Sequence, residues 1–219
     1  AHGALQDNQQ CNSHEVEPED LAAIMLDLQE DGCHNLDLVS PSHVVPMILD
    51  ALAFAIDQGL KIPLVYSSSG YDDVRTLKLL DGIIDIYRPE MRFGSNHSSL
   101  MISGHTDYVS INQAVVREMH RQVGDLTISH KGLAISGLMV RHSVLPGGLA
   151  DTRVITQFLA EKISRNTYVH IMDDHVPSIE AARRHPELGR HLRADELESA
   201  LNAVHAVGLH RLRKRPVAW

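Results

Sequence analysis

The stretch HNLDLVSPSHVVPMILDALAFAIDQGLKIPLVYS, residues 34–67, contains a complete strand–helix–strand unit. Residues 34–39 and 62–67 have the apolar and β-branched composition of short strands. Between them, residues 42–59 repeat apolar side chains at helical spacing, with Ser42 placed as an N-cap. Two strands joined through a helix must run parallel, because a tight turn cannot connect parallel neighbours. The stretch therefore predicts one βαβ unit of a parallel sheet.

The same alternation continues on both sides of this unit, after a helix at 18–31. Further helices are expected at 72–82, 108–123, 149–163 and 194–207, further strands at 83–87, 137–144 and 167–172, and a small hairpin at 126–136. Repeated βα units predict a single α/β domain over residues 1–219. Within it we expect an irregular N-terminal segment at 1–16, a variable loop at 88–107 and a basic tail at 208–219.

Composition narrows the class of protein. The chain has 219 residues, of which 43% are apolar, and this is enough to fill a sizeable core without disulfide bonds. Only two cysteines are present, and no run of about 18 apolar residues occurs, so we expect a protein of the cytoplasm without a membrane span. The net charge of −8 disfavours nucleic acid as a partner, although residues 210–216 are locally basic.

Polar residues gather where each predicted strand ends, and in parallel α/β sheets ligands bind at the carboxyl ends of the strands. These residues are Ser40, Ser42, His43, Tyr66, Ser67, Ser68, Ser69, Gly70, Arg88, Glu90, Arg92, Arg141, His142, His170, Asp173, Asp174 and His175. His43 could bind a ligand or simply cap the helix. Arg141 and His142 are adjacent in a strand, so only one of them can face the site.

A metal hydrolase is one hypothesis for the last of these strand ends. His170, Asp173, Asp174 and His175 have side chains that can bind a metal ion, but their spacing matches no standard zinc pattern. The chain also contains no P-loop, no GxGxxG motif and no convincing Ser-His-Asp arrangement.

Several blocks of sequence, in the same order, carry a resemblance to a known family. They are LQEDGCHNLDLVSPSHVVP, IPLVYSSSGYDDVRTLKLLDGIIDIYRPEMR, EMHRQVGDL, GLMVRHSVLPGG and TYVHIMDDHVP, and they span about residues 14 to 212. The chain thereby resembles the radical S-adenosylmethionine (SAM) proteins related to pyruvate formate-lyase activating enzyme. The resemblance implies a partial (β/α)6 TIM-like barrel that binds SAM and a 4Fe-4S cluster.

The cysteines depart from this family. Its members hold the cluster with a CxxxCxxC loop, because three thiolates bind three irons and leave the fourth for SAM. This chain contains only Cys11 and Cys33, which are 22 positions apart. We therefore expect a radical SAM-type domain whose first strand and cluster loop are missing, and which is truncated or degenerate and inactive as this chain.

The resemblance also implies roles for particular residues. Ser40, His43, Ser68 and Ser69 stand where relatives contact SAM, and Glu90, Arg141, His142 and Asp173 stand where polar contacts to SAM or substrate are expected. The implied partner is a protein substrate similar to a glycyl-radical enzyme. Non-catalytic binding of a nucleoside, of SAM or of a partner protein is the alternative function. Loss of the first strand would expose the edge of strand 34–39, through which a dimer could form.

Overall fold

A computed structural model describes residues 15–212 of the chain. Its centre is a sheet in which β1, β2, β3, β5 and β6 lie side by side in that order and run parallel. The short β4 pairs antiparallel with β5. The strands are β1 Leu36–Val39, β2 Leu64–Ser68, β3 Ile86–Pro89, β4 Thr127–Ile128, β5 Ala134–Ser143 and β6 Tyr168–Met172.

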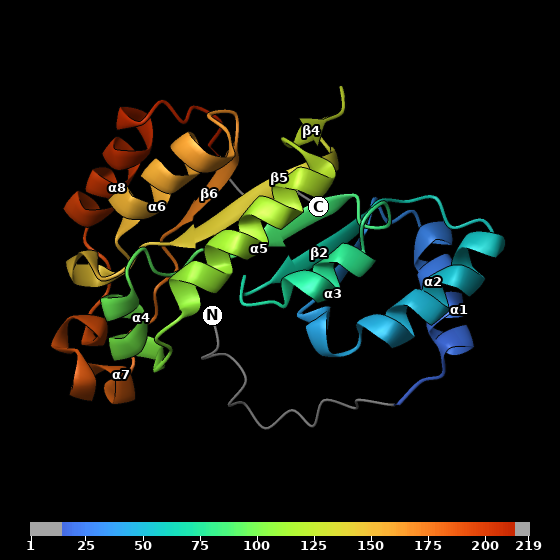
Figure 1. Cartoon of the computed structure of the whole chain (residues 1–219), viewed down its shortest axis with the longest axis horizontal. Helices are drawn as coiled ribbons and strands as arrows, with labels where there is room; N and C mark the ends of the chain where they lie inside the picture. The colour runs from blue at the N-terminus through green and yellow to red at the C-terminus, as the bar shows by residue number, and fades with distance from the viewer. Residues whose placement is uncertain (1–14, 213–219) are drawn as a thin grey trace.

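Helices follow the parallel strands and pack on one face of the sheet. The described helices are α1 Pro18–Glu30, α2 Val45–Asp57, α3 Val74–Leu79, α4 Asn96–Ser103, α5 Tyr108–Val123, α6 Thr152–Phe158, α7 Ile179–Arg184 and α8 Ala194–Ala206. Figure 1 shows α5 lying across β5, α1 and α2 together at one end of the molecule, and α6 and α8 together with β6 at the other. This arrangement confirms the predicted α/β order with a parallel sheet. The finer description as part of a (β/α)6 barrel stays a prediction.

Several element boundaries differ from those expected from the sequence. Ser42 does not cap α2, because residues 41–43 form a separate 3-10 turn and α2 begins at Val45. The expected hairpin and the following strand are one structure, in which β4 folds back on a long β5. The loop predicted at 88–107 contains the helix α4, and the segment between β6 and α8, for which no helix is predicted, contains α7.

Apolar side chains fill both faces of the sheet. Between the sheet and the helices lies the main core, to which the strands contribute Leu36, Leu64, Tyr66, Tyr87, Leu138, Val140 and Val169. A smaller cluster lies on the other face and consists of Val65, Ile86, Leu126 and Met139, with Ala134 and Tyr168 packed against it. Alternate residues of each strand thus face opposite sides, as the pleat requires. We call the side of the smaller cluster the inner face.

In the part of the chain that the structure describes, none of the helices is both long and apolar enough to cross a membrane. The expected N-terminal segment 1–16 falls almost wholly outside the described residues, and so does most of the tail 208–219.

Candidate functional site

The inner face changes from apolar to polar along the strands. In the register of the sheet Val65 lies beside Ile86, and Met139 beside Tyr168. Two residues further along each strand, toward the carboxyl ends, the neighbours are Ser67 with Arg88 and Arg141 with His170. We call Asp37, Ser67, Arg88, Glu90, Arg141 and His170 the polar inner row. It lies at the end of the sheet where parallel α/β proteins bind ligands.

Glu90 is the most buried charge of this row. Its residue is 4% exposed, and its carboxylate accepts hydrogen bonds from Arg92 Nε at 2.6 Å and from Arg141 at 3.2 Å. Both arginines keep part of their side chains open to solvent, with 32% and 24% exposed. A buried carboxylate is stabilised by such charge-assisted bonds, while the exposed guanidinium edges can still bind a ligand.

The backbone at Glu90 is fixed by α5. Asn112 Nδ2 donates to the carbonyl oxygens of Glu90 at 2.8 Å and of Gly70 at 2.9 Å. Tyr108 OH lies 3.3 Å from the same Glu90 oxygen, and burial raises the pKa of this tyrosine, so it keeps its proton. The ends of β2 and β3 are therefore held in place by one helix.

A second ion pair joins three neighbouring strands. Asp37 on β1 accepts from Ser67 Oγ at 2.5 Å and from Arg88 at 2.5 Å. The side chains of Arg88 and Asp37 are 16% and 29% exposed. Together with the Glu90 pairs, this contact lines the inner face with three arginines and two carboxylates. Such a surface suits a ligand that carries both anionic and cationic groups.

On the helix side of the sheet, beyond the strand ends, the carboxylate of Asp72 accepts hydrogen bonds from three hydroxyl groups. Tyr66 OH donates to this carboxylate at 3.0 Å and Ser68 Oγ at 2.7 Å, and Ser42 Oγ also donates to it. Burial and the charge of Asp72 raise the pKa of Tyr66, so the phenol remains a donor. This network ties the turn after β1 to β2 and thereby holds the turn that carries His43.

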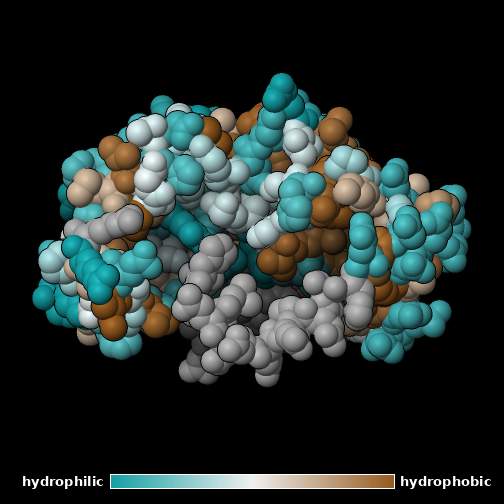
Figure 2. Space-filling view, turned by 90° about the horizontal axis from the view of Figure 1, so that it is seen from below, coloured by the Kyte–Doolittle hydropathy of each residue, from teal (hydrophilic) through white to brown (hydrophobic). Residues whose placement is uncertain are grey.

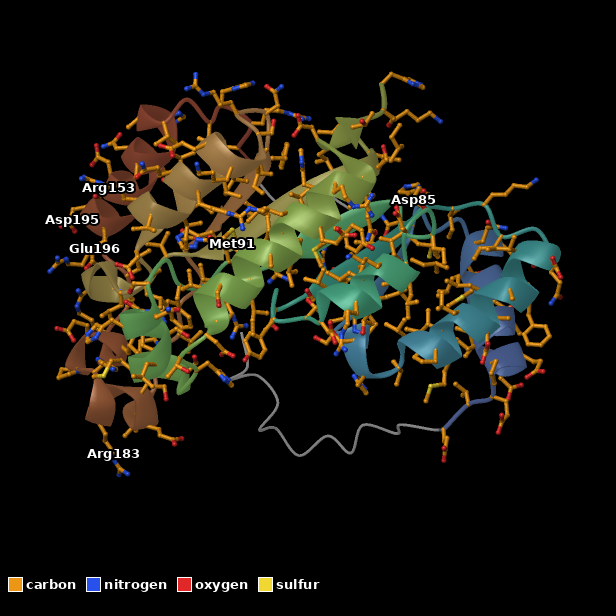
Figure 3. All side chains as sticks on the ribbon, in the orientation of Figure 1. Asp85, Met91, Arg153, Arg183, Asp195 and Glu196 are labelled. Carbon is orange, nitrogen blue, oxygen red and sulfur yellow. The ribbon has the colours of Figure 1, made fainter. Side chains whose placement is uncertain are left out.

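His142 lies on the opposite side of the sheet from Arg141. It is fully buried, with Nδ1 2.7 Å from the carbonyl oxygen of Met91 and Nε2 2.8 Å from Thr152 Oγ1. Burial lowers its pKa, so the ring is neutral near pH 7. Figure 3 shows Met91 near the middle of the molecule, away from the labelled charges of α8. Both ring nitrogens have protein partners, and His142 is thus not presented to a ligand at the inner face.

The structure distributes the residues expected from the sequence over three places. Glu90 and Arg141 meet in the polar inner row, whereas Ser68 is buried and turned toward Asp72. Ser40, His43, Ser69 and Asp173 are exposed in the turns after the strands. Ser40 adopts a left-handed conformation with φ of 53°, which is unusual for a residue other than glycine, and its N–H donates to the Ser67 carbonyl at 2.7 Å. These turns border the carboxyl ends of the strands.

Sequence reasoning missed Asp37, Asp72 and Asn112. Asp37 could have been found from the alternation of Leu36, Asp37 and Leu38, which places a charge on the face opposite two apolar residues. Asp72 and Asn112 carry no local signal, since their partners lie on other elements.

Figure 2 views the molecule from below Figure 1 and shows a recess in the middle of this side. Hydrophilic residues lie deep within it, and hydrophobic residues border it on one side. In the described part of the chain, no group of three or more His, Cys, Asp and Glu side chains is arranged to hold a metal ion. The structure therefore gives no support to the hydrolase site proposed at His170, Asp173, Asp174 and His175.

Comparison with known proteins shows a likeness of fold to a solved structure. No protein-family model matches the chain. Among solved structures, a radical SAM methyltransferase from Sphaerobacter thermophilus superposes with a TM-score of 0.60 over 92% of this chain and 58% of that protein. The two proteins share a fold. At 10% sequence identity the likeness concerns the fold alone.

One curated protein is similar in sequence. It is the uncharacterized protein MJ0674 of Methanocaldococcus jannaschii, with 26% identity over 195 residues. The match covers 88% of this chain and 52% of that protein, so the chain spans about half the length of this relative.

The iron–sulfur cluster of radical SAM proteins can be tested against the residues present. Such a cluster requires three thiolates close to the carboxyl ends of the strands. Cys33 is partly buried and precedes β1, so it lies at the amino end of the sheet, and Cys11 lies outside the described residues. The described residues do not fit the cluster.

Proposed function

We propose that the polar inner row binds SAM or a related nucleoside with a charged amino-acid tail, and that the protein is a radical SAM-type protein resembling pyruvate formate-lyase activating enzymes. One observation carries the proposal. Glu90 lies between Arg92 and Arg141 at the carboxyl ends of parallel strands, in a sheet whose fold is shared with a radical SAM methyltransferase.

The chemistry of SAM suits these side chains. Its tail has a carboxylate, which the exposed edges of Arg92 and Arg141 can bind, and an amino group, which suits the carboxylate of Glu90 or Asp37. Ser40, His43 and Ser69 border the same end of the sheet with hydroxyl and imidazole groups that could reach the ribose or the base. The apolar cluster below the row would exclude water from the bottom of the site.

Radical chemistry is proposed only for a form of the protein that has a cluster. Two cysteines cannot supply three thiolates, and we derive no radical step for this chain. We expect that, after anaerobic reconstitution with iron and sulfide, this chain alone forms no deoxyadenosine from SAM. Deoxyadenosine production with a stoichiometric cluster would overturn this expectation.

Binding of the ligand can be tested separately by titration calorimetry with SAM and S-adenosylhomocysteine. The wild-type chain should bind SAM at about micromolar affinity, and Arg141→Ala should weaken binding at least about tenfold. Arg153→Ala is the matched control, because Arg153 is exposed on α6, away from the inner face (Figure 3), and should bind like the wild type. Absence of a heat signal, or equal affinities of the two variants, would count against the proposal.

Non-catalytic binding of a nucleoside or partner protein is the second candidate. It is favoured by the ion pairs and hydrogen bonds around the strand ends, which form without any cluster. Binding of both SAM and S-adenosylhomocysteine by this chain in the absence of a cluster, with no deoxyadenosine formed, would support it. A glycyl-radical-like protein substrate and a dimer through the β1 edge remain further proposals, and sedimentation velocity tests the second.

A further inference from the structure

The charges of this chain are strongly segregated. Residues 1–60 contain eleven of the 28 acidic residues and none of the 20 lysines and arginines, the first of which is Lys61. Residues 61–219 have 20 cations against 17 acids and are thus slightly positive. The negative net charge of the protein therefore comes from the segment that forms α1, β1 and α2.

Most of these acids lie exposed on one helix pair. The exposed acids on and beside α1 and α2 are Glu15, Glu17, Glu19, Asp20, Asp27, Glu30, Asp31, Asp50 and Asp57. Within residues 15–212, the acid of this segment that forms an ion pair is Asp37, which faces Arg88 on the inner face. The outer surface of the α1–α2 pair thus carries carboxylates without intramolecular cations.

Exposed hydrophobic side chains are concentrated in the same segment. It holds seven of the sixteen exposed large hydrophobic residues of the described chain: Val16, Ile24, Leu28, Val39, Met47, Phe54 and Ile56. Ile24 and Leu28 are one helical turn apart on α1 and are 45% and 39% exposed. Figure 2 shows hydrophilic and hydrophobic residues side by side at this end of the molecule. Single exposed hydrophobics are ordinary, but such a concentration marks an interaction surface.

The ends of the two helices also lack the charges that would stabilise them. A helix C-terminus is partially negative and favours cations. Neither α1 nor α2 has a basic residue in its last turn, and Asp27, Glu30 and Asp57 lie near these ends. A partner that supplies lysine or arginine there would offset this repulsion.

These observations restrict the kind of partner. Nucleic acid and anionic membrane surfaces are repelled by a surface of this sign. A second copy packed symmetrically through the same helices would bring carboxylates against carboxylates. What remains is a cationic surface with its own apolar stripe.

We infer that the α1–α2 pair is the docking surface for a basic amphipathic helix of a partner protein. Leucine-type side chains of that helix would cover Ile24 and Leu28, and its lysines or arginines would face Asp27 and Glu30. This surface is separate from the polar inner row and does not depend on the function proposed for it.

A synthetic helical peptide tests the inference. The probe is a fluorescent peptide of leucine and lysine at amphipathic spacing, roughly 14 residues or about four turns long, and fluorescence anisotropy reports its binding to the full chain. We expect saturable binding that weakens as NaCl rises from about 50 to 500 mM. The triple variant Asp27→Asn, Glu30→Gln, Asp31→Asn should bind about tenfold more weakly, and Ile24→Ser with Leu28→Ser should weaken binding to a similar extent.

The matched control removes three exposed carboxylates elsewhere, by Glu161→Gln, Glu180→Gln and Glu198→Gln. It has the same net charge as the acidic triple variant and should bind like the wild type. Circular dichroism establishes that all variants are folded. Equal weakening by both triple variants would mean that only net charge attracts the peptide, and would overturn the inference. Sedimentation without peptide that shows self-association, abolished by the α1 variants, would assign the surface to a second copy and overturn it too.

Discussion

Asp72 is the residue on which the ends of β1 and β2 depend. Its carboxylate accepts from Ser42, Tyr66 and Ser68, and two of these three residues are buried with it. Asp72→Ala would remove the acceptor of Ser68 Oγ and leave Tyr66 OH only the longer contact with Ser42 Oγ at 3.1 Å, so we expect the free energy of unfolding to fall by about 2–4 kcal/mol. Urea denaturation measures this change.

Two further variants delimit that prediction. Asp57→Ala removes an exposed carboxylate and should change stability by less than about 0.5 kcal/mol. In a double-mutant cycle, Tyr66→Phe should cost less in the Asp72→Ala background than in the wild type, because the bond is already absent. Additive losses would show that Tyr66 and Asp72 are not coupled.

His142 gives a prediction about pH. Burial lowers its pKa in the folded state, whereas the unfolded chain takes up the proton near pH 6.5. Below that pH the unfolded state binds more protons at this site, so stability should fall as pH decreases, by at most about 1.4 kcal/mol per pH unit. His142→Gln lacks this proton and should show a shallower decrease between pH 7 and 5 in urea denaturation. Parallel curves for the two proteins would contradict it.

At the residue scale, the sequence predicts which residues meet only where their position at a strand end decides it; that they bind a ligand stays a prediction. Glu90 and Arg141 follow directly from their places at strand ends, since parallel strands deliver such residues to one edge. Ser68 and His142 were misplaced because a shift of one residue along a strand reverses the face, and the sequence did not fix the strand register. The role of Asp72 could not be predicted from the sequence, because its contacts with its three partners form only when the chain is packed.

Position 70, where the end of β2 contacts α5, requires a glycine. Its φ is +72°, and a Cβ there would lie 2.2 Å from Asn112 Nδ2 and 2.3 Å from the Glu90 carbonyl oxygen. Gly82 has a similar φ of +80° with nothing within 4 Å of a Cβ. Gly82→Ala should thus cost about 1–2 kcal/mol from backbone strain alone, and Gly70→Ala at least about 2 kcal/mol more from the clash.

Thermal and urea unfolding of the two glycine variants measure that difference. We also expect the amide signals near Glu90 to shift in nuclear magnetic resonance spectra of Gly70→Ala, because Asn112 must move. Equal losses of stability in both variants would show that the contact between Gly70 and Asn112 is not tight.

At the element scale, long periodic segments were predicted well and short ones were not. The helix at 108–123 has the same ends in the structure, because its apolar stripe runs over four turns. The helix α4 was predicted as a loop and α7 was not predicted, since both are short and largely exposed and have little apolar periodicity. The turn at Pro41–His43 replaced the expected N-cap because Ser42 bonds to Asp72 instead of to the helix.

At the scale of the whole molecule, the βα alternation was sufficient to predict a parallel sheet with helices on it. It was not sufficient to define which strands meet at the inner face, because that depends on twist and on register across β3 and β5. The uneven distribution of charge was available from the sequence as well. Only the structure shows that these acids are exposed on two helices that pack against each other.

This charge distribution predicts that one end of the molecule is less stable at low salt. The α1–α2 pair joins the sheet through the edge strand β1, and its carboxylates repel one another. Raising NaCl from about 0.02 to 0.5 M shortens the screening length several-fold. The higher salt concentration should slow hydrogen exchange of the α1 amides, because it raises the free energy of local opening there by up to about 1 kcal/mol. Exchange in α5 should change little, because α5 carries both signs of charge. Native-state exchange measured by mass spectrometry resolves the two helices, and equal slowing in both would show that salt acts on global unfolding rather than on the acidic helix pair.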